Sequence, residues 1–207
     1  MKTIQAPIVS EQVIQKSKFI SYLFVVDSEA QAREYLSEIK KQHPKANHHC
    51  FAMVIDEIVR SNDDGEPASS AGVPMLQILQ ANQLNYVLAI VVRYFGGIKL
   101  GVGGLIRAYS SSVQLALEEA VILEKTIVRE VDVAIDFDQL SIVETQLNEK
   151  AIILDRSYSD KAHFKLEVYQ LDILEELTNL SSGRLEIIDN KPVEKWLETK
   201  TNQEVVE

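Results

Sequence analysis

Residues 63–110 read DDGEPASSAGVPMLQILQANQLNYVLAIVVRYFGGIKLGVGGLIRAYS, and the rest of the chain is organised around this stretch. Seven of the eight glycines lie in it. The overlapping segment 67–117 has no Asp or Glu but contains Arg93, Lys99 and Arg107, a local charge of +3 in a chain of net charge −10. Clustered glycine and positive charge before a helix are typical of an anion site.

The bulk composition is that of an ordinary soluble globular protein, with 46% apolar and 25% charged residues. No apolar run approaches the length of a membrane span, and the N-terminal residues lack the apolar core of a signal peptide. The single cysteine, Cys50, excludes an internal disulfide framework and suits a reducing compartment. We therefore expect a cytoplasmic location and no membrane contact.

Charge is spread unevenly outside the central stretch. Residues 1–66 have 8 basic and 10 acidic side chains, whereas residues 118–207 have 10 and 21. The acidic balance argues against broad nonspecific binding of nucleic acid, which depends on neutralising phosphates. This acidic balance is compatible with a small basic face on one domain.

Hydrophobic periodicity predicts an α+β protein with two domains, residues 1–127 and 128–207. In the first domain, the continuously apolar run 86–92 indicates a strand covered on both faces. Other strands are expected at 19–26, 48–55 and 59–62, and helices at 28–43, 74–81 and 104–120.

The second domain alternates in the order β-α-β-β-α-β, which is the ferredoxin-like pattern. Leu171, Leu174 and Leu177 indicate its second helix, and residues 184–188 its last strand. Residues 192–207 are expected to form a short acidic tail, with a helical turn at Val193–Leu197.

The loop 95–103 follows the buried strand and precedes a helix, where free N–H groups can approach an anion. The spacing is neither a Walker A loop nor G-x-G-x-x-G. A competing interpretation is that the glycines only permit tight packing of strand and helix. The candidate binding residues here are Arg93, Tyr94, Gly96, Gly97, Lys99, Gly101, Gly103, Gly104 and Arg107.

An acidic loop contributes three further candidates, Asp63, Asp64 and Glu66. Closely spaced carboxylates could hold Mg²⁺ or act as acid and base. Asp-Gly and Glu-Pro are also ordinary turn chemistry. We favour a turn whose acids form salt bridges with the three basic residues of the central stretch.

His48, His49 and Cys50 follow one another on an expected strand, so His48 and Cys50 share a face. No further ligand completes a zinc set, although a Cys–His nucleophile stays open as an alternative. We expect His48 to bond to the acidic loop and count it among the binding residues. Ser110–Ser112 are expected on a solvated helix face. We assign no catalytic residue, metal or cofactor.

Three segments resemble the IMPACT family, whose bacterial members are called YigZ-like. They are HHCFA (48–52), DDGEPASSAGVPML (63–76) and VVRYFGGIKLGVGGLIRAYS (91–110). These motifs are long and specific. One departure is Ser69, which stands where the family has glycine and changes the turn there.

The resemblance implies an N-terminal domain like a small-subunit ribosomal protein domain and like domain IV of elongation factor G. It also implies a ferredoxin-like second domain. Eukaryotic members are linked to translational control through the starvation-sensing kinase pathway. No catalytic residue is established for the family, so none is carried over.

Three functional hypotheses follow. The first is a non-enzymatic regulatory protein that binds RNA, the ribosome or a translation factor through the glycine-rich basic loop. The second is an enzyme acting on a phosphorylated or nucleotide small molecule, which makes a phosphate-bearing ligand the partner. The third is a protein-interaction module that uses the acidic second domain. An oligomeric state is not indicated.

Overall fold

The structure is a computed structural model that describes residues 1–170 and 172–199. The chain forms two compact units, Met1–Glu124 with the chain from Glu198 onward, and Lys125–Leu197. Helices and two antiparallel sheets make up the described residues, which confirms a mixed α/β class. No helix among the described residues is long and apolar enough to cross a membrane.

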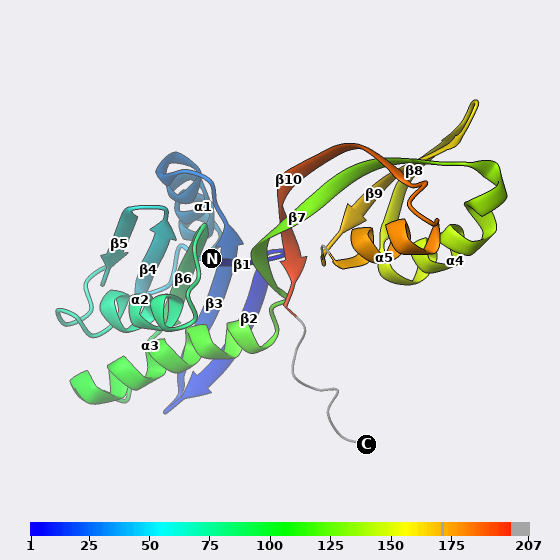
Figure 1. Ribbon diagram of the computed structural model, residues 1–207. Coiled ribbons are helices and arrows are strands. Elements are labelled where there is room, and N and C mark those ends of the chain that lie inside the picture. Colours follow the sequence, from blue (N-terminus) through cyan, green and yellow to red (C-terminus); the bar gives the residue numbers. More distant parts are fainter. Residues whose placement is uncertain (171, 200–207) are drawn as a thin grey trace, which may run out of the picture. The chain divides into compact units, whose positions relative to one another are not determined.

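The first unit is built on a five-stranded antiparallel sheet of order β2-β3-β6-β4-β5 (Figure 1). Strand β6 lies at its centre and is buried along nearly its whole length, as its continuous apolar run predicted. The strands are β2 (Ile8–Ile14), β3 (Ser17–Val25), β4 (His48–Ile55), β5 (Ile58–Asn62) and β6 (Val87–Tyr94).

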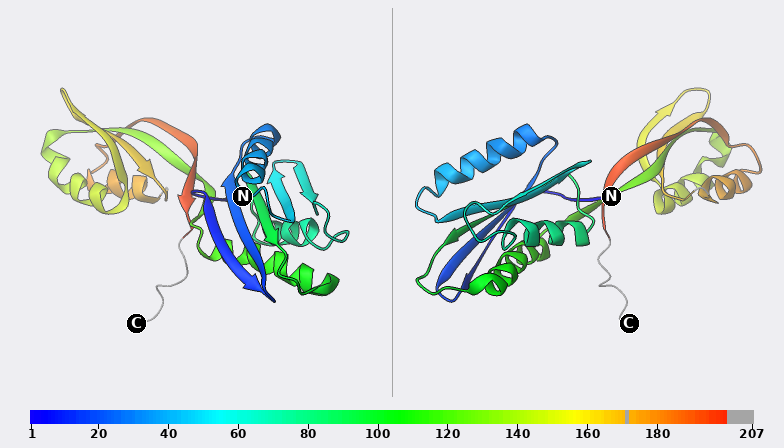
Figure 2. Two further views of the ribbon diagram at one scale, coloured as in Figure 1. Left: turned by 180° about the vertical axis from the view of Figure 1, so that it is seen from behind. Right: turned by 90° about the vertical axis from the view of Figure 1, so that its left-hand side faces the viewer.

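Helices cover both faces of this sheet, as the right-hand view of Figure 2 shows. Helix α1 (Glu29–Gln42) packs on one face, and its N-terminus is capped by Ser28 Oγ, which accepts from the Gln31 N–H. Helices α2 (Gly72–Ala81) and α3 (Gly101–Glu118) pack on the other face. Two apolar cores result, one on each side of β6.

Helix α3 differs from its expected form in two ways. It begins at Gly101 rather than Gly104, because the first turn of a helix has no intrahelical N–H partners to lose and tolerates glycine. The expectation of a solvated face at Ser110–Ser112 is wrong for Ser112, which is 1% exposed. Its hydroxyl is satisfied internally by donating to the Ala108 carbonyl at 2.7 Å.

The second unit has the expected element order β-α-β-β-α-β. Its strands follow the order β10-β7-β9-β8, and both helices contribute to one apolar core with β7 and β9. The first residues of β7 pair with β1 (Lys2–Ile4) within the first unit. The elements are β7 (Ile122–Ile135), a 3₁₀ turn (Phe137–Gln139), α4 (Leu140–Lys150), β8 (Ile152–Tyr158), β9 (Ala162–Val168), α5 (Asp172–Leu180) and β10 (Glu186–Glu198).

The predicted helical turn at Val193–Leu197 is wrong. These residues belong to β10, which pairs with β7. Their half-buried positions are Val193, Lys195 and Leu197, a period of two that fits a strand. Leu171 and residues 200–207 of the expected tail lie outside the described residues.

Candidate functional site

The acidic loop after β5 is tied down by hydrogen bonds of its own. Asp63 Oδ1 accepts from the N–H groups of Ala71 and Gly72, at 3.0 and 2.8 Å, and Oδ2 accepts from Ser69 N–H at 2.8 Å. The carboxylate therefore satisfies N–H groups that have no partner within α2, and its negative charge lies at the positive end of the helix dipole. Asp63 thus has a structural role, which explains part of the turn chemistry expected at this loop.

Glu66 and Arg93 form a buried ion pair. Arg93 Nη1 donates to Glu66 Oε1 at 2.5 Å, and the two side chains are only 6% and 4% exposed. The guanidinium also lies over the rings of Phe19 and Phe95, at 5.4 and 5.6 Å from their centroids. The expected pairing between acidic loop and basic segment is present here, and it neutralises one of the three cations.

Tyr109 and Cys50 extend this pair into a buried network. The Tyr109 hydroxyl donates to Glu66 Oε1 at 2.8 Å, and the Cys50 thiol lies 3.4 Å from that hydroxyl and 3.0 Å from the Asp63 carbonyl. Burial raises the pKa of the Cys50 thiol to about 12. A fully buried, protonated thiol is a poor nucleophile, so the Cys–His alternative loses its physical basis.

His48 bonds to the acidic loop, as the sequence led us to expect. Its Nδ1 lies 2.9 Å from the Asp64 carbonyl, and its Nε2 lies 3.8 Å from Glu66 Oε1. Burial opposes ionisation of Asp64, but the His49 N–H and Lys40 outweigh it and hold the pKa of that carboxyl below its usual range. Among the described residues, no group of three or more His, Cys, Asp and Glu side chains could hold a metal ion.

The other basic residues lie at the surface with several apolar neighbours. No ion pair within the described part of the chain involves Lys99 or Arg107, and both are exposed. We call the exposed side chains of the loop after β6 and of the first turns of α3 the docking patch. Its members are Phe95, Ile98, Lys99, Val102, Ile106 and Arg107.

The glycines of this region serve different purposes. A Cβ on Gly96 would lie 2.0 Å from the Lys16 backbone, so glycine is required there by close packing. Gly97 has open space around it, but its φ of +86° is a conformation that favours glycine, so the backbone conformation requires glycine there. Gly101, Gly103 and Gly104 lie in the first turn of α3. A Cβ on Gly104 would lie 2.9 Å from the Leu100 Cβ, whereas open space surrounds Gly101.

Tyr94 does not join the cluster. It follows Arg93 on β6 and therefore faces the opposite side of the sheet. There its hydroxyl lies 2.9 Å from His43 Nδ1, while His43 Nε2 lies 2.6 Å from the Tyr22 hydroxyl. The structure thus brings together the acidic loop, His48 and Arg93, and separates them from Tyr94.

A cavity of about 390 Å³ opens where the acidic loop, the loop after β6 and the start of α3 meet. Its lining is mostly apolar, with the Glu66–Arg93 pair as its buried polar element. The lining residues are Glu66, Pro67, Arg93, Phe95, Lys99, Leu100, Gly101, Val102 and Leu105.

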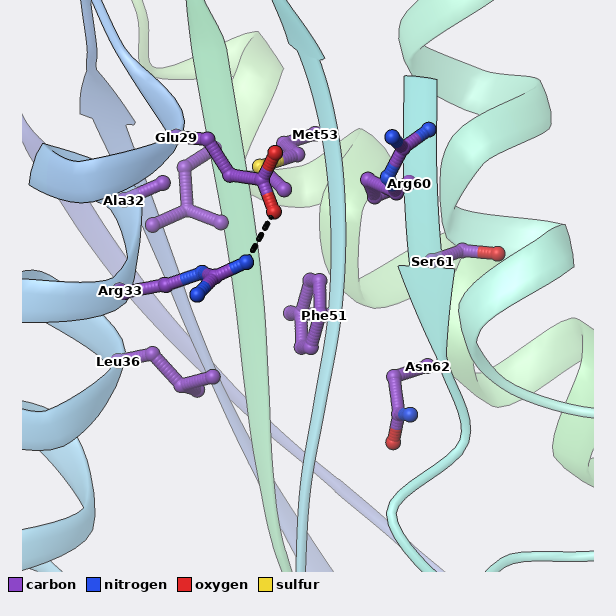
Figure 3. Close-up of a pocket in the computed structure, with 10 residues that line it drawn as sticks. Glu29, Ala32, Arg33, Leu36, Phe51, Met53, Arg60, Ser61 and Asn62 are labelled. Carbon is purple, nitrogen blue, oxygen red and sulfur yellow. Dashed lines mark hydrogen bonds and ion pairs between the residues drawn. The ribbon is translucent and has the colours of Figure 1, made fainter. Parts of the chain in front are cut away.

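A second cavity, of about 260 Å³, lies on the opposite face of the sheet between α1 and β5 (Figure 3). Phe51 and Leu36 contribute apolar walls, and Glu29 pairs with Arg33 at 2.6 Å along the α1 side of the cavity. None of the candidate residues from the sequence lines it.

The sequence did not single out three residues that the structure places in the site. Tyr109 and Leu105 were expected only as apolar positions of a helix, and Phe95 as a loop residue. Spacing could have indicated the first two, since Leu105 and Tyr109 lie one turn apart on a helix. Nothing in the sequence indicates that a tyrosine hydroxyl reaches a glutamate 43 positions away.

Comparisons with known proteins agree on one family. The family model described as "Impact N-terminal domain" matches residues 15–117. IMPACT family member YvyE of Bacillus subtilis is 42% identical over 86% of this chain and 85% of its own length. IMPACT family member YigZ of Escherichia coli is 32% identical over 88% and 94%. A solved structure titled as a hypothetical protein aligns with a TM-score of 0.58 and 32% identity, covering 90% of this chain and 95% of that one.

Proposed function

This chain belongs to the IMPACT family, and we propose that it is a non-enzymatic regulatory protein that binds the translation machinery. Its target is the ribosome, its RNA or a translation factor. The observation that carries the proposal is the docking patch, which combines exposed apolar and basic side chains on the motif-bearing segment.

The apolar side chains of the patch favour a binding surface. Four large apolar residues are exposed within a dozen positions. Clustered exposed apolar surface is uncommon on monomers and marks contact sites. They are Phe95 (44% exposed), Ile98 (41%), Val102 (53%) and Ile106 (38%).

The charge of the patch limits how it binds. Arg93 is neutralised by Glu66, so only Lys99 and Arg107 can neutralise phosphates. Two phosphate contacts correspond to a slope of roughly −1.4 to −1.8 in log affinity against log salt. Affinity must therefore come largely from apolar contact, which suits a surface of mixed protein and RNA better than a bare phosphate backbone.

A binding role is further supported by the state of the reactive side chains. Cys50 is buried with a raised pKa, and Asp63 is occupied by three backbone N–H groups. Glu66 accepts from both Arg93 and Tyr109. These three groups are engaged in contacts of the fold, which favours a binding role for them over a role in chemistry.

Fold-level expectations are part of the same proposal. We infer a ferredoxin-like second domain over residues 128–207, supported by its element order and the strand order β10-β7-β9-β8. We also infer that residues 1–127 form a domain like the small-subunit ribosomal protein domain and domain IV of elongation factor G. A cytoplasmic location follows from a role in translation.

The acidic second unit is a weaker candidate for the partner surface. Several of its acids are paired within the unit: Lys150 contacts Glu176 at 2.6 Å, and Lys161 contacts Glu186 at 2.6 Å. Paired acids attract a basic partner less strongly than free ones.

Co-sedimentation of purified protein with ribosomes, at low and raised salt, tests the proposal. We expect association with a shallow salt dependence, and loss of association in Ile106→Asp. Ile142→Asp is the matched control, because Ile142 is an exposed isoleucine on a helix of the other unit. Absence of wild-type binding to ribosomes, ribosomal RNA and translation factors at low salt would overturn the proposal.

A further inference from the structure

We propose that the cavity beside the docking patch binds a nucleoside phosphate, supplied either as a free nucleotide or as an unpaired nucleotide of RNA. The inference rests on the proposed function in one respect, since it names the ligand chemistry of the same surface. The cavity is of ligand size, at about 390 Å³. One end of the cavity is apolar, which suits a base, and the other end is positively charged, which suits a phosphate.

The apolar walls suit a planar base. Phe95 is a ring on the rim of the cavity, partly exposed, with the Arg93 guanidinium 5.6 Å from its centroid. Val102 and Leu105 of α3 supply aliphatic surface to the same cavity. A base stacked on an exposed aromatic ring between aliphatic side chains is the usual arrangement in proteins that bind single-stranded nucleic acid.

The buried polar element can bond to the edge of the base. The contacts that Glu66 makes to Arg93, Tyr109 and His48 within the described chain all use Oε1. Arg93 Nε is buried and has no hydrogen-bond partner among the described residues. Glu66 Oε2 therefore stays outside these contacts as an acceptor, and the buried Arg93 Nε is a donor that a base reaches only when the guanidinium turns toward the cavity. Nucleobases carry adjacent donors and acceptors on their edges.

The phosphate end is formed by Lys99 and the N-terminus of α3. This 18-residue helix has no side-chain cap and no acidic residue in its first turn. Open space surrounds the Cβ position of Gly101, and only the end of the Arg107 side chain approaches that of Gly103, so no side chain of these two residues screens the helix start. The acid that lines the cavity, Glu66, is neutralised by Arg93, so this end of the cavity carries net positive charge.

Titration calorimetry on the full chain tests this site. The probes are AMP, GMP, CMP and UMP, a six-nucleotide single-stranded RNA, and two probes without a base, inorganic phosphate and ribose 5-phosphate. We expect the nucleotides or the RNA to bind and the two base-free probes to bind at least tenfold more weakly. Tighter binding of the RNA identifies an RNA nucleotide as the ligand, and tighter binding of a mononucleotide identifies a free one.

Variants separate stacking from simple anion binding. Phe95→Leu keeps apolar volume but removes the ring, and it should weaken nucleotide binding by about fivefold or more. Lys99→Gln should weaken it as well, and Lys99→Arg should restore it. The matched controls are Phe137→Leu and Lys45→Gln, exposed residues away from the cavity, which should leave binding unchanged. Unchanged melting temperatures confirm that the variants fold.

Three results would overturn the inference: no binding of any nucleotide or of the RNA, inorganic phosphate binding as tightly as nucleotides, or unchanged binding by Phe95→Leu. Ile106 does not line the cavity, so Ile106→Asp should retain nucleotide binding even where ribosome association is lost. Nucleotide binding without association with ribosomes, ribosomal RNA or translation factors would remove the proposed function alone. Ribosome association without nucleotide binding would remove this inference alone.

Discussion

The carboxylate of Glu66 and the guanidinium of Arg93 meet at 2.5 Å with both side chains almost fully buried. One residue comes from the acidic loop after β5, and the other from the end of the central strand β6. The pair converts an apparent basic segment of three cations into a surface with two. It also places a neutralised acid and base at the inner wall of the cavity at the start of α3.

Removing one partner of this pair should lower the free energy of unfolding strongly, whereas replacing both partners should lower it little. Arg93→Met leaves the Glu66 charge buried without its cation, and we expect it to lower the free energy of unfolding by roughly 3–5 kcal/mol. The double variant Arg93→Met with Glu66→Leu should recover most of that loss. Urea denaturation measures both. A double variant as unstable as the sum of the two single variants would contradict a buried-charge cost.

Asp63 should stabilise the protein through the start of α2. Asp63→Ala leaves three backbone N–H groups without their acceptor, and we expect a loss of roughly 2 kcal/mol in the free energy of unfolding. Asp27→Ala is the control, because Asp27 is exposed and its side chain makes no hydrogen bond or ion pair within the described chain; it should change stability by less than about 0.5 kcal/mol. Equal effects of the two substitutions would refute the capping role.

Substituting alanine for two glycines of the same region should change the stability of the protein in opposite directions. Gly96→Ala would place a Cβ 2.0 Å from the Lys16 backbone and should destabilise by several kcal/mol or prevent folding. Gly103→Ala meets only the end of the Arg107 side chain, at 3.7 Å, and should stabilise by up to about 1 kcal/mol through helix propensity. Thermal denaturation of the two variants makes the comparison. A neutral Gly96→Ala would show that the close approach is absent.

Alkaline pH should weaken the fold through Cys50. The thiol pKa is raised from 9.0 to about 12 in the folded state, so between these values the unfolded chain loses a proton that the folded chain keeps. Stability contributed by this group therefore falls as pH rises, by about 1.4 kcal/mol per unit within that window. We expect the loss to be smaller in Cys50→Ala, measured by urea denaturation from pH 8 to 11. Parallel pH profiles for the two proteins would argue against the buried thiol.

Several elements could be predicted because the signal was local. The apolar run of β6 indicated a strand covered on both faces, and Ser28 with Gln31 indicated the start of α1. Strand β2 gave no such signal, because Val9 and Val13 are exposed on an edge strand. The sequence predicts the start of β10 as a strand, within residues 184–188, but not its continuation beyond residue 191, where the strand pairs with β7.

The sequence grouped some residues that the structure brings together, but it did not indicate their connections. His48, Asp64, Glu66 and Arg93 do lie together. The choice of Arg93, rather than Lys99 or Arg107, as the partner of Glu66 required the structure. The side chain at the end of β6 points inward while the two later cations lie at the surface.

The sequence alone determined the central buried strand, the order of elements in the second unit, the family motifs and the clustering of charge and glycine. These features depend on neighbours within a few positions. Only the tertiary structure decided which charged side chains are paired within the protein. Burial makes an unpaired charge costly, so the fold pairs Glu66 with Arg93 and holds Asp63 at a helix start, while Lys99 and Arg107 are exposed and in no ion pair of the described residues. That selection depends on contacts between segments far apart in the chain, which local sequence patterns do not contain.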